Sequence, residues 1–213
     1  MDLSSPISSV VPSAHGAVLN VLARTSEPLS GRKVAELTDG KVGQWRANEI
    51  LGQLSDAGIV LREHRPPAKL YRLNHDHVAA PGILALAEMW TTLVQRMRDE
   101  LATWELPPTS AGLFGSAARG EAASDSDIDV LLIRDDDRVR SDTEERQWHG
   151  QVDRLTERVQ DWSGNTCEVL ELSLAELGEA VKGEGRLVRD LRRDAIALAG
   201  RDLRTLVRRP VNR

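Results

Sequence analysis

The segment 115–130 constrains this chain more than any other stretch, because it combines a glycine turn with closely spaced carboxylates. Gly115 and Ser116 follow the apolar pair Leu113 and Phe114. Glycine allows the backbone to turn sharply and allows a ligand to approach it closely. The serine hydroxyl can cap the helix that follows or bind a phosphate oxygen, and the N–H groups at a helix start favour an anion. The segment therefore begins with the pattern of a phosphate-binding turn.

A strand that carries two aspartates comes next. Ile128 and the run 130–133 are apolar and mostly branched, which is typical of a buried strand. Asp127 and Asp129 are two residues apart, so their side chains project from one face. The two carboxylates repel each other and are costly to bury, whereas Mg²⁺ binds both carboxylate oxygens and substrate phosphates. The pattern predicts metal-assisted nucleotide chemistry; the alternative is a polar edge strand beside an unrelated glycine turn.

Together these residues resemble the signature of a known enzyme family. Gly115-Ser116 is followed, after ten residues, by Asp127-x-Asp129, and Ala118-Arg119-Gly120 lies between them. This motif is similar to that of minimal nucleotidyltransferases of the DNA polymerase β superfamily, and the resemblance extends over residues 106–200. The resemblance implies an enzyme with two Mg²⁺ ions that moves an NMP from an NTP, expected to be ATP, onto a hydroxyl group.

The resemblance also assigns residues to roles. The family's third acid lies between hydrophobic residues in a downstream strand, which indicates Glu168 in Cys167-Glu168-Val169. Strand alternation puts Glu168 and Glu171 on opposite faces and does not choose between them. Arg119 either touches phosphate or is a surface arginine. The residues expected to be catalytic and to bind metal are Asp127, Asp129 and Glu168, and those expected to bind nucleotide are Gly115, Ser116 and Arg119.

Composition fits a chain of one large or two small domains. The 213 residues include 40% hydrophobic ones, and the net charge of −5 argues against a protein that coats nucleic acid. Cys167 is the only cysteine, so no intrachain disulfide can form. No apolar run reaches the roughly 18 residues of a membrane span, and residues 1–12 lack the pattern of a signal peptide. We therefore expect a cytoplasmic protein.

The N-terminal part has a different pattern. Apolar spacing and turn residues predict three helices and then two short strands, over 14–24, 31–37, 42–57, 59–64 and 69–73. The apolar face expected for the third helix includes Trp45, Ile50, Leu51 and Leu54. This order resembles a winged helix-turn-helix domain over 13–77, in which the third helix enters the major groove of DNA.

Basic and amide side chains cluster in the two elements that such a domain uses on DNA. Arginine, asparagine and glutamine read base edges, and lysine and arginine neutralise phosphates. The candidates are Lys41, Gln44, Arg46 and Asn48 in the third helix, and Arg62, Arg65 and Lys69 in the hairpin. The alternative is a winged helix used for protein contacts or dimerisation, and a homodimer is a further expectation.

The remaining boundaries follow from breakers and periodicity. We expect an α+β chain that begins with a flexible N-terminus (1–12) and a winged helix-turn-helix (13–77). A linker at Pro81-Gly82 and one long amphipathic helix over 83–104 make up residues 78–106. A small mixed-sheet nucleotidyltransferase domain flanked by helices (107–200) and a basic tail (201–213) follow. Ser173 and Glu176 form a capping box pattern, and the last long helix is expected over 186–199.

Two function classes remain open at this stage. The first is a nucleotidyltransferase that modifies a protein, an RNA or a small molecule, with the winged helix for targeting or autoregulation. Minimal members of the superfamily resemble antitoxins that adenylylate a partner toxin, which favours a protein acceptor. The second is a DNA-binding transcriptional regulator whose transferase-like domain senses a nucleotide without catalysis.

Overall fold

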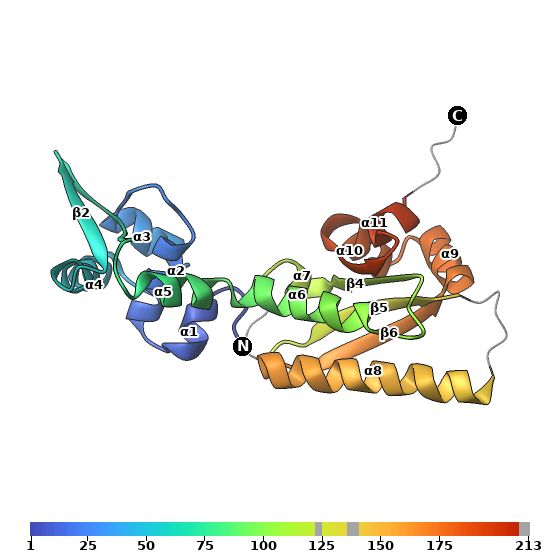
Figure 1. The fold of residues 1–213 in the computed structure, drawn as a ribbon. Coiled ribbons are helices and arrows are strands. Elements are labelled where there is room, and N and C mark those ends of the chain that lie inside the picture. Colours follow the sequence, from blue (N-terminus) through green and yellow to red (C-terminus); the bar gives the residue numbers. More distant parts are fainter. Residues whose placement is uncertain (122–124, 136–140, 209–213) are drawn as a thin grey trace. The chain divides into compact units, whose positions relative to one another are not determined.

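The computed structural model describes residues 1–121, 125–135 and 141–208. The chain is a mixed α+β protein with two small open sheets, and it divides into two compact units (Figure 1). Residues 4–90 form the N-terminal unit and residues 91–213 the C-terminal unit. In the part of the chain that is described, every helix is too short or too polar to cross a membrane.

The N-terminal unit is mainly helical, with a three-stranded antiparallel sheet in the order β1-β3-β2. The hairpin β2–β3 pairs from Val60 with Leu73 to Arg65 with Ala68. Its elements are α1 (Pro6–Val10), α2 (Ala14–Ala23), β1 (Leu29–Ser30), α3 (Gly31–Leu37), α4 (Gln44–Asp56), β2 (Val60–Arg65), β3 (Ala68–Leu73) and α5 (Ala80–Ala87). The helices and strands expected from the sequence are confirmed to within two residues at nearly every end.

The core of this unit lies between α2, α3, α4 and the sheet. Val18, Leu22, Ile50 and Leu51 are buried in it. The apolar face of α4 differs from the expected one, because Trp45 is 77% exposed. Ala47 is fully buried and lies on the same face as Ile50, Leu51 and Leu54. Helical spacing allowed either Trp45 or Ala47 on this apolar face, and only the packing of α4 against α2 and α3 selects Ala47.

Three expectations about the ends of this unit are wrong. Residues 1–12 contain helix α1, in which Ile7 is buried, and α1 packs against α2 and α5. The long helix expected over 83–104 is two helices, since α5 ends before Glu88 and a second helix begins at Met89. Pro81 and Gly82 lie inside α5 rather than in a linker, because proline fits the first turn of a helix without losing a hydrogen bond.

The C-terminal unit has a four-stranded sheet in the order β6-β5-β4-β7. β5 is parallel to β6 and antiparallel to β4, which in turn is antiparallel to β7. Its elements are α6 (Met89–Ala102, in this unit from Thr91), β4 (Ser110–Phe114), α7 (Gly115–Ala118), β5 (Ile128–Arg134), α8 (Asp142–Ser163), β6 (Cys167–Ser173), α9 (Leu174–Gly183), α10 (Arg186–Asp194), β7 (Ile196–Gly200) and α11 (Leu203–Leu206).

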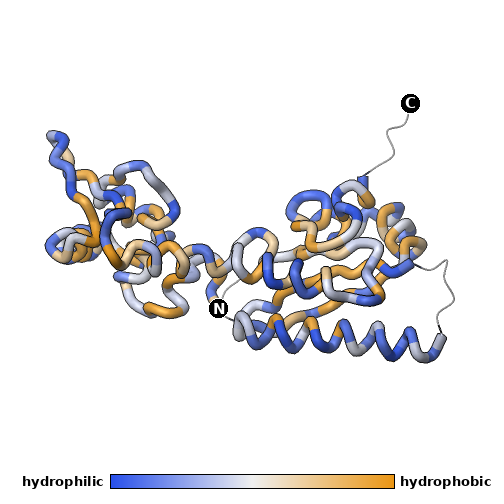
Figure 2. The backbone as a smooth tube through the Cα atoms, viewed as in Figure 1, coloured by the Kyte–Doolittle hydropathy of each residue, from blue (hydrophilic) through white to orange (hydrophobic). Residues whose placement is uncertain are grey.

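Helices cover both faces of this sheet. α8 lies along one side, and α9, α10 and α11 gather on the other (Figure 1). Figure 2 shows hydrophobic strands and a long α8 that is mostly hydrophilic, as expected of a helix that buries one stripe. Leu131 and Ile133 of β5 pack with Leu177 and Leu191. Trp148 of α8 is fully buried and meets Trp104 edge to face at 5.5 Å.

The C-terminal end of the chain also departs from expectation. The last long helix ends at Asp194, and residues 196–200 form strand β7 instead. Its backbone pairs with β4, and the carbonyl oxygen of Ala197 accepts hydrogen bonds from the Arg98 guanidinium. Leu203 and Val207 are fully buried, so the segment expected to be a basic tail contributes to the core as far as Val207. Residues 209–213 lie outside the described residues.

Candidate active site

The glycine turn lies directly against one of the aspartates. β4 ends at Phe114, and Gly115 begins the short helix α7 with a φ of +71°, which favours glycine. A Cβ atom at Gly115 would lie 2.3 Å from Oδ2 of Asp129. Any larger residue would therefore strain the backbone and collide with the carboxylate. The glycine of the motif brings the turn and the acid into contact.

Ser116 does not cap the helix. Phe114 occupies the N-cap position of α7, and no side chain makes a capping hydrogen bond there. Ser116 is half-buried, and its hydroxyl makes no hydrogen bond to any residue that the structure describes. The structure therefore does not support the capping role that the sequence allowed for this hydroxyl.

The strand pairing brings Asp129 and Glu168 together. β5 and β6 are parallel, and Asp129 is directly in register with Glu168. Side chains at paired positions of parallel strands point to the same face. By alternation that face is also the face of Leu131 and Leu172, which pack toward α9 and α10. Asp127 is two residues before Asp129 and is exposed, just ahead of the strand.

Glu171 lies on the other face and already has partners. Its carboxylate accepts a hydrogen bond of 2.5 Å from Nε1 of Trp148, and it is 3.7 Å from Nη1 of Arg134. Both contacts lie on the α8 side of the sheet. The register thus separates the two glutamates that strand periodicity alone left open: Glu168 is beside Asp129, and Glu171 is part of the packing under α8.

The electrostatics of this edge are those of crowded negative charge. The pKa of Asp129 is raised, chiefly by burial and then by the nearby charges of Glu168 and Asp127. The pKa of the buried Cys167 thiol is raised to about 12 by burial and then by the charges of Asp129 and Glu168. The neighbouring acids are therefore close enough to disfavour the charge of Asp129, and Arg186 counteracts this effect.

The carboxylates of Asp127, Asp129 and Glu168 are ligands of the type that a hard cation binds. Oxygen donors that repel one another are stabilised by Mg²⁺, and the pKa of Asp129 is raised by burial first and then by the charges of Glu168 and Asp127. Within the described ranges, however, no three His, Cys, Asp or Glu side chains are arranged as a closed metal site. Asp127, Asp129 and Glu168 share one edge of the sheet without converging on a point.

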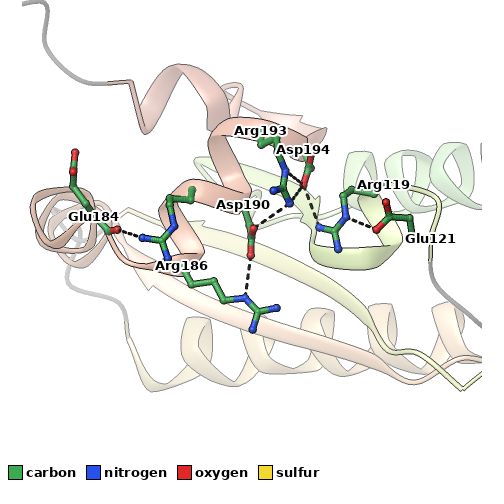
Figure 3. A network of polar contacts seen from close by, with 8 residues as sticks. Arg119, Glu121, Glu184, Arg186, Asp190, Arg193 and Asp194 are labelled. Carbon is green, nitrogen blue, oxygen red and sulfur yellow. Dashed lines mark hydrogen bonds and ion pairs between the residues drawn. The ribbon is translucent and has the colours of Figure 1, made fainter.

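Arg119 is engaged by two carboxylates. It lies 2.6 Å from Glu121 and 3.1 Å from Asp194 of α10 (Figure 3). These contacts raise the pKa of Arg119 and lower that of Asp194, to which Arg193 contributes most. Arg119 therefore ties α7 to α10, whether or not it also touches a ligand.

Sequence reasoning missed one residue near the carboxylates. Arg186 begins α10, and its side chain is 89% exposed, with one loose contact of 3.5 Å to Asp190 (Figure 3). Its positive charge acts on Asp129. The only signal in the sequence is the excess of basic residues after Lys182, which does not single out one arginine. The fold selects Arg186, because α10 crosses the same face as Asp129.

The N-terminal unit has a polar groove at the residues expected to meet DNA. Gln44 and Asn48 of α4 line it together with Arg62 and Lys69 of the hairpin, and Arg32 of α3 adds a further charge. The groove encloses about 710 Å³. The structure thus brings four of the seven expected residues together around one concave surface.

The other three expected residues are held in ion pairs. Arg46 lies 2.6 Å from Glu49 within α4, and Arg65 lies 3.0 Å from Glu63 within β2. Lys41 lies 3.1 Å from Asp2. These three side chains do not line the groove; each of them pairs with a carboxylate instead.

Comparison with known proteins finds a similarity within the C-terminal unit. Residues 94–180 match the family model of the nucleotidyltransferase domain. The matched range contains the Gly115-Ser116 turn, both aspartates and Glu168. Such domains generally use an NTP and a divalent metal ion. We found no match to the chain among curated proteins or solved structures.

Proposed function

We propose that this protein is a Mg²⁺-dependent nucleotidyltransferase that moves an NMP, from ATP in the first instance, onto a hydroxyl of a protein, an RNA or a small molecule. The observation that carries the proposal is the pairing of Asp129 with Glu168 at an edge where Gly115 presses against the Asp129 carboxylate. The match of residues 94–180 to the nucleotidyltransferase domain supports it independently.

The residues divide into those that hold phosphate and those that hold acceptor and metal. Ser116 and the N–H groups of the turn donate hydrogen bonds to the β- and γ-phosphates, and Arg186 adds positive charge there. Asp127, Asp129 and Glu168 would hold Mg²⁺, which supplies electrostatic stabilisation of charge on the phosphate oxygens when bound.

The proposed reaction forms one bond to the α-phosphorus and breaks another. The acceptor oxygen forms a bond to the α-phosphorus, the bond from that phosphorus to the bridging oxygen breaks, and pyrophosphate leaves. Glu168 accepts the proton of the acceptor hydroxyl, because its carboxylate lies beside Asp129 and is exposed to solvent. Glu171 has no such role, since its carboxylate is bound to Trp148.

A matched pair of variants tests this assignment. The full chain is incubated with Mg²⁺ and each α-labelled NTP, with total protein or total RNA as acceptor, and label transfer and pyrophosphate are measured. Glu168→Gln should lower transfer by about 100-fold or more, because the amide accepts no proton and binds metal poorly. Glu171→Gln should keep most of it, and EDTA should abolish it.

The opposite pattern would move the site to Glu171. Pyrophosphate release that neither EDTA nor Glu168→Gln reduces would show that another site carries it. Failure to release pyrophosphate with any NTP, together with specific DNA binding, would favour the regulator that only senses a nucleotide.

We also propose that the N-terminal unit is a winged helix-turn-helix that binds duplex DNA for targeting or autoregulation. The element order α2, β1, α3, α4, β2, β3 supports this, as does the hairpin that extends beyond the helices. The basic and amide residues of the groove are of the types that contact phosphates and base edges.

A further inference from the structure

Trp45 is the most exposed tryptophan of the chain. Its side chain is 77% exposed, whereas the other tryptophans are buried or half-buried. Single exposed apolar side chains are common on protein surfaces, but an indole is the largest of them and is concentrated at binding surfaces. The position of Trp45 on α4 therefore decides whether it belongs to such a surface.

Trp45 continues the strip of α4 that lines the polar groove. Asn48 and Gly52 both line this groove, and they follow Trp45 by three and by seven residues. Residues at these intervals lie on one face of an α-helix. Trp45 therefore extends this face of the groove by one turn, at the end where α4 begins.

The charges of the groove indicate which kind of partner fits there. Its charged lining residues are Arg32, Arg62 and Lys69, and no aspartate or glutamate lines the groove among the residues that the structure describes. Glu49, further along α4, lies 2.6 Å from Arg46, which compensates its charge. In a chain with a net charge of −5, this surface is complementary to a polyanion.

The surroundings of Trp45 favour DNA over a protein partner. The exposed residues around it at the start of α4 are Gln44, Arg46 and Asn48, so the indole is a single apolar group in a polar surface. The core of a protein interface is apolar and depleted in charged residues. The major groove of DNA has the opposite pattern, because thymine adds one methyl group to an edge of hydrogen-bonding groups.

We propose that Trp45 is a specificity-determining residue of the N-terminal unit, and that its indole packs on the 5-methyl group of a thymine in the major groove. The residues at the start of a recognition helix contact base edges, and Trp45 is the second residue of α4. The inference rests on the DNA binding proposed above for this unit and does not depend on the transferase activity.

Removal of single methyl groups from the DNA tests the proposal. The full chain selects a duplex from a pool with a randomised centre, and each thymine of that duplex is then replaced by deoxyuridine, which lacks only the 5-methyl group. At one thymine the replacement should weaken binding about fourfold, as expected for the apolar contact of one methyl group. Trp45→Ala should bind the thymine and deoxyuridine duplexes equally, and Trp45→Phe should keep part of the difference.

A control variant and a second measurement make the result specific. Gln53→Ala, an exposed change in the last turn of α4 outside the groove, should keep the difference between the two duplexes. The selected duplex should also reduce the quenching of tryptophan fluorescence by acrylamide, because it covers Trp45. The Trp45→Phe protein should lose this protection.

Three outcomes would contradict the assignment. A difference between the duplexes that survives Trp45→Ala would show that another residue contacts the methyl group. A selected duplex in which no deoxyuridine weakens binding would overturn the role of Trp45 while leaving DNA binding by this unit in place. A full chain that selects no duplex would overturn both proposals.

Discussion

At the scale of single residues, the contact between Gly115 and Asp129 defines the site. A glycine with positive φ is common in turns, and Gly120 has one as well. Gly115 differs because its missing Cβ is the space in which the Asp129 carboxylate lies. The requirement for glycine at position 115 is therefore both conformational and steric.

Alanine substitutions separate these two requirements. Gly115→Ala should destabilise the fold by about 1–3 kcal/mol and abolish transfer, because strain is added to a collision with Asp129. Gly120→Ala should carry the backbone strain alone, since nothing lies within 4 Å of its Cβ position. Denaturant unfolding and NMP transfer are measured for both. Equal losses of activity would show that the contact with Asp129 is irrelevant.

Burial of Asp129 and the charges of its neighbours lead to a prediction about stability. A carboxyl whose pKa is raised in the folded state binds its proton more tightly there than in the unfolded state, so its ionised form destabilises the fold. Asp129→Asn should therefore raise the free energy of unfolding in EDTA at neutral pH, by at most about 1 kcal/mol because solvent screens this half-exposed group.

The same variant should lose transfer activity. Asp153→Asn, on the exposed side of α8, is the control and should change neither quantity. An Asp129→Asn protein that is less stable than the parent in EDTA would mean that burial and the neighbouring carboxylates do not disfavour the charge of Asp129.

At the scale of elements, α10 contributes a charge that no motif contains. Arg186→Ala should raise KM for the NTP by about tenfold, worth about 1.4 kcal/mol, with a smaller effect on kcat, because the arginine binds phosphate in both ground and transition states. Arg189→Ala is the control on the same helix, since that guanidinium donates to the carbonyl oxygen of Glu184. Steady-state kinetics with varied NTP concentration compares the two variants. An unchanged KM for Arg186→Ala would show that Arg186 is not part of the site.

At the scale of the whole molecule, the two units have separate cores and separate candidate functions. Arg62→Gln and Lys69→Gln in the groove should weaken binding to duplex DNA and lower the salt dependence by about one phosphate contact each. Both variants should leave NMP transfer unchanged. Fluorescence anisotropy over a range of salt concentrations measures the DNA affinity of each variant, and Arg154→Gln, on α8 of the other unit, is the control. If neither substitution changes the DNA affinity, then DNA binds at another surface or the protein does not bind DNA.

The sequence by itself determined the features that depend on near neighbours. The spacing of Asp127 and Asp129 puts them on one strand face, and Gly115 marks the turn. Caps are equally local: Ser173 forms the capping box of α9 with Glu176, as expected, and Ser30 caps α3. Such features involve residues a few positions apart, so their geometry follows from backbone periodicity.

Only the tertiary structure decided what depends on distant segments. The register of β5 with β6 places Glu168 rather than Glu171 beside Asp129, because a parallel pair joins residues that a long helix separates in sequence. The same holds for β7, which pairs with β4 although its residues continue a helical pattern. Trp45 is exposed and Arg186 faces the carboxylates for one reason: the packing of whole elements, which local periodicity does not encode, sets which face of each helix is covered.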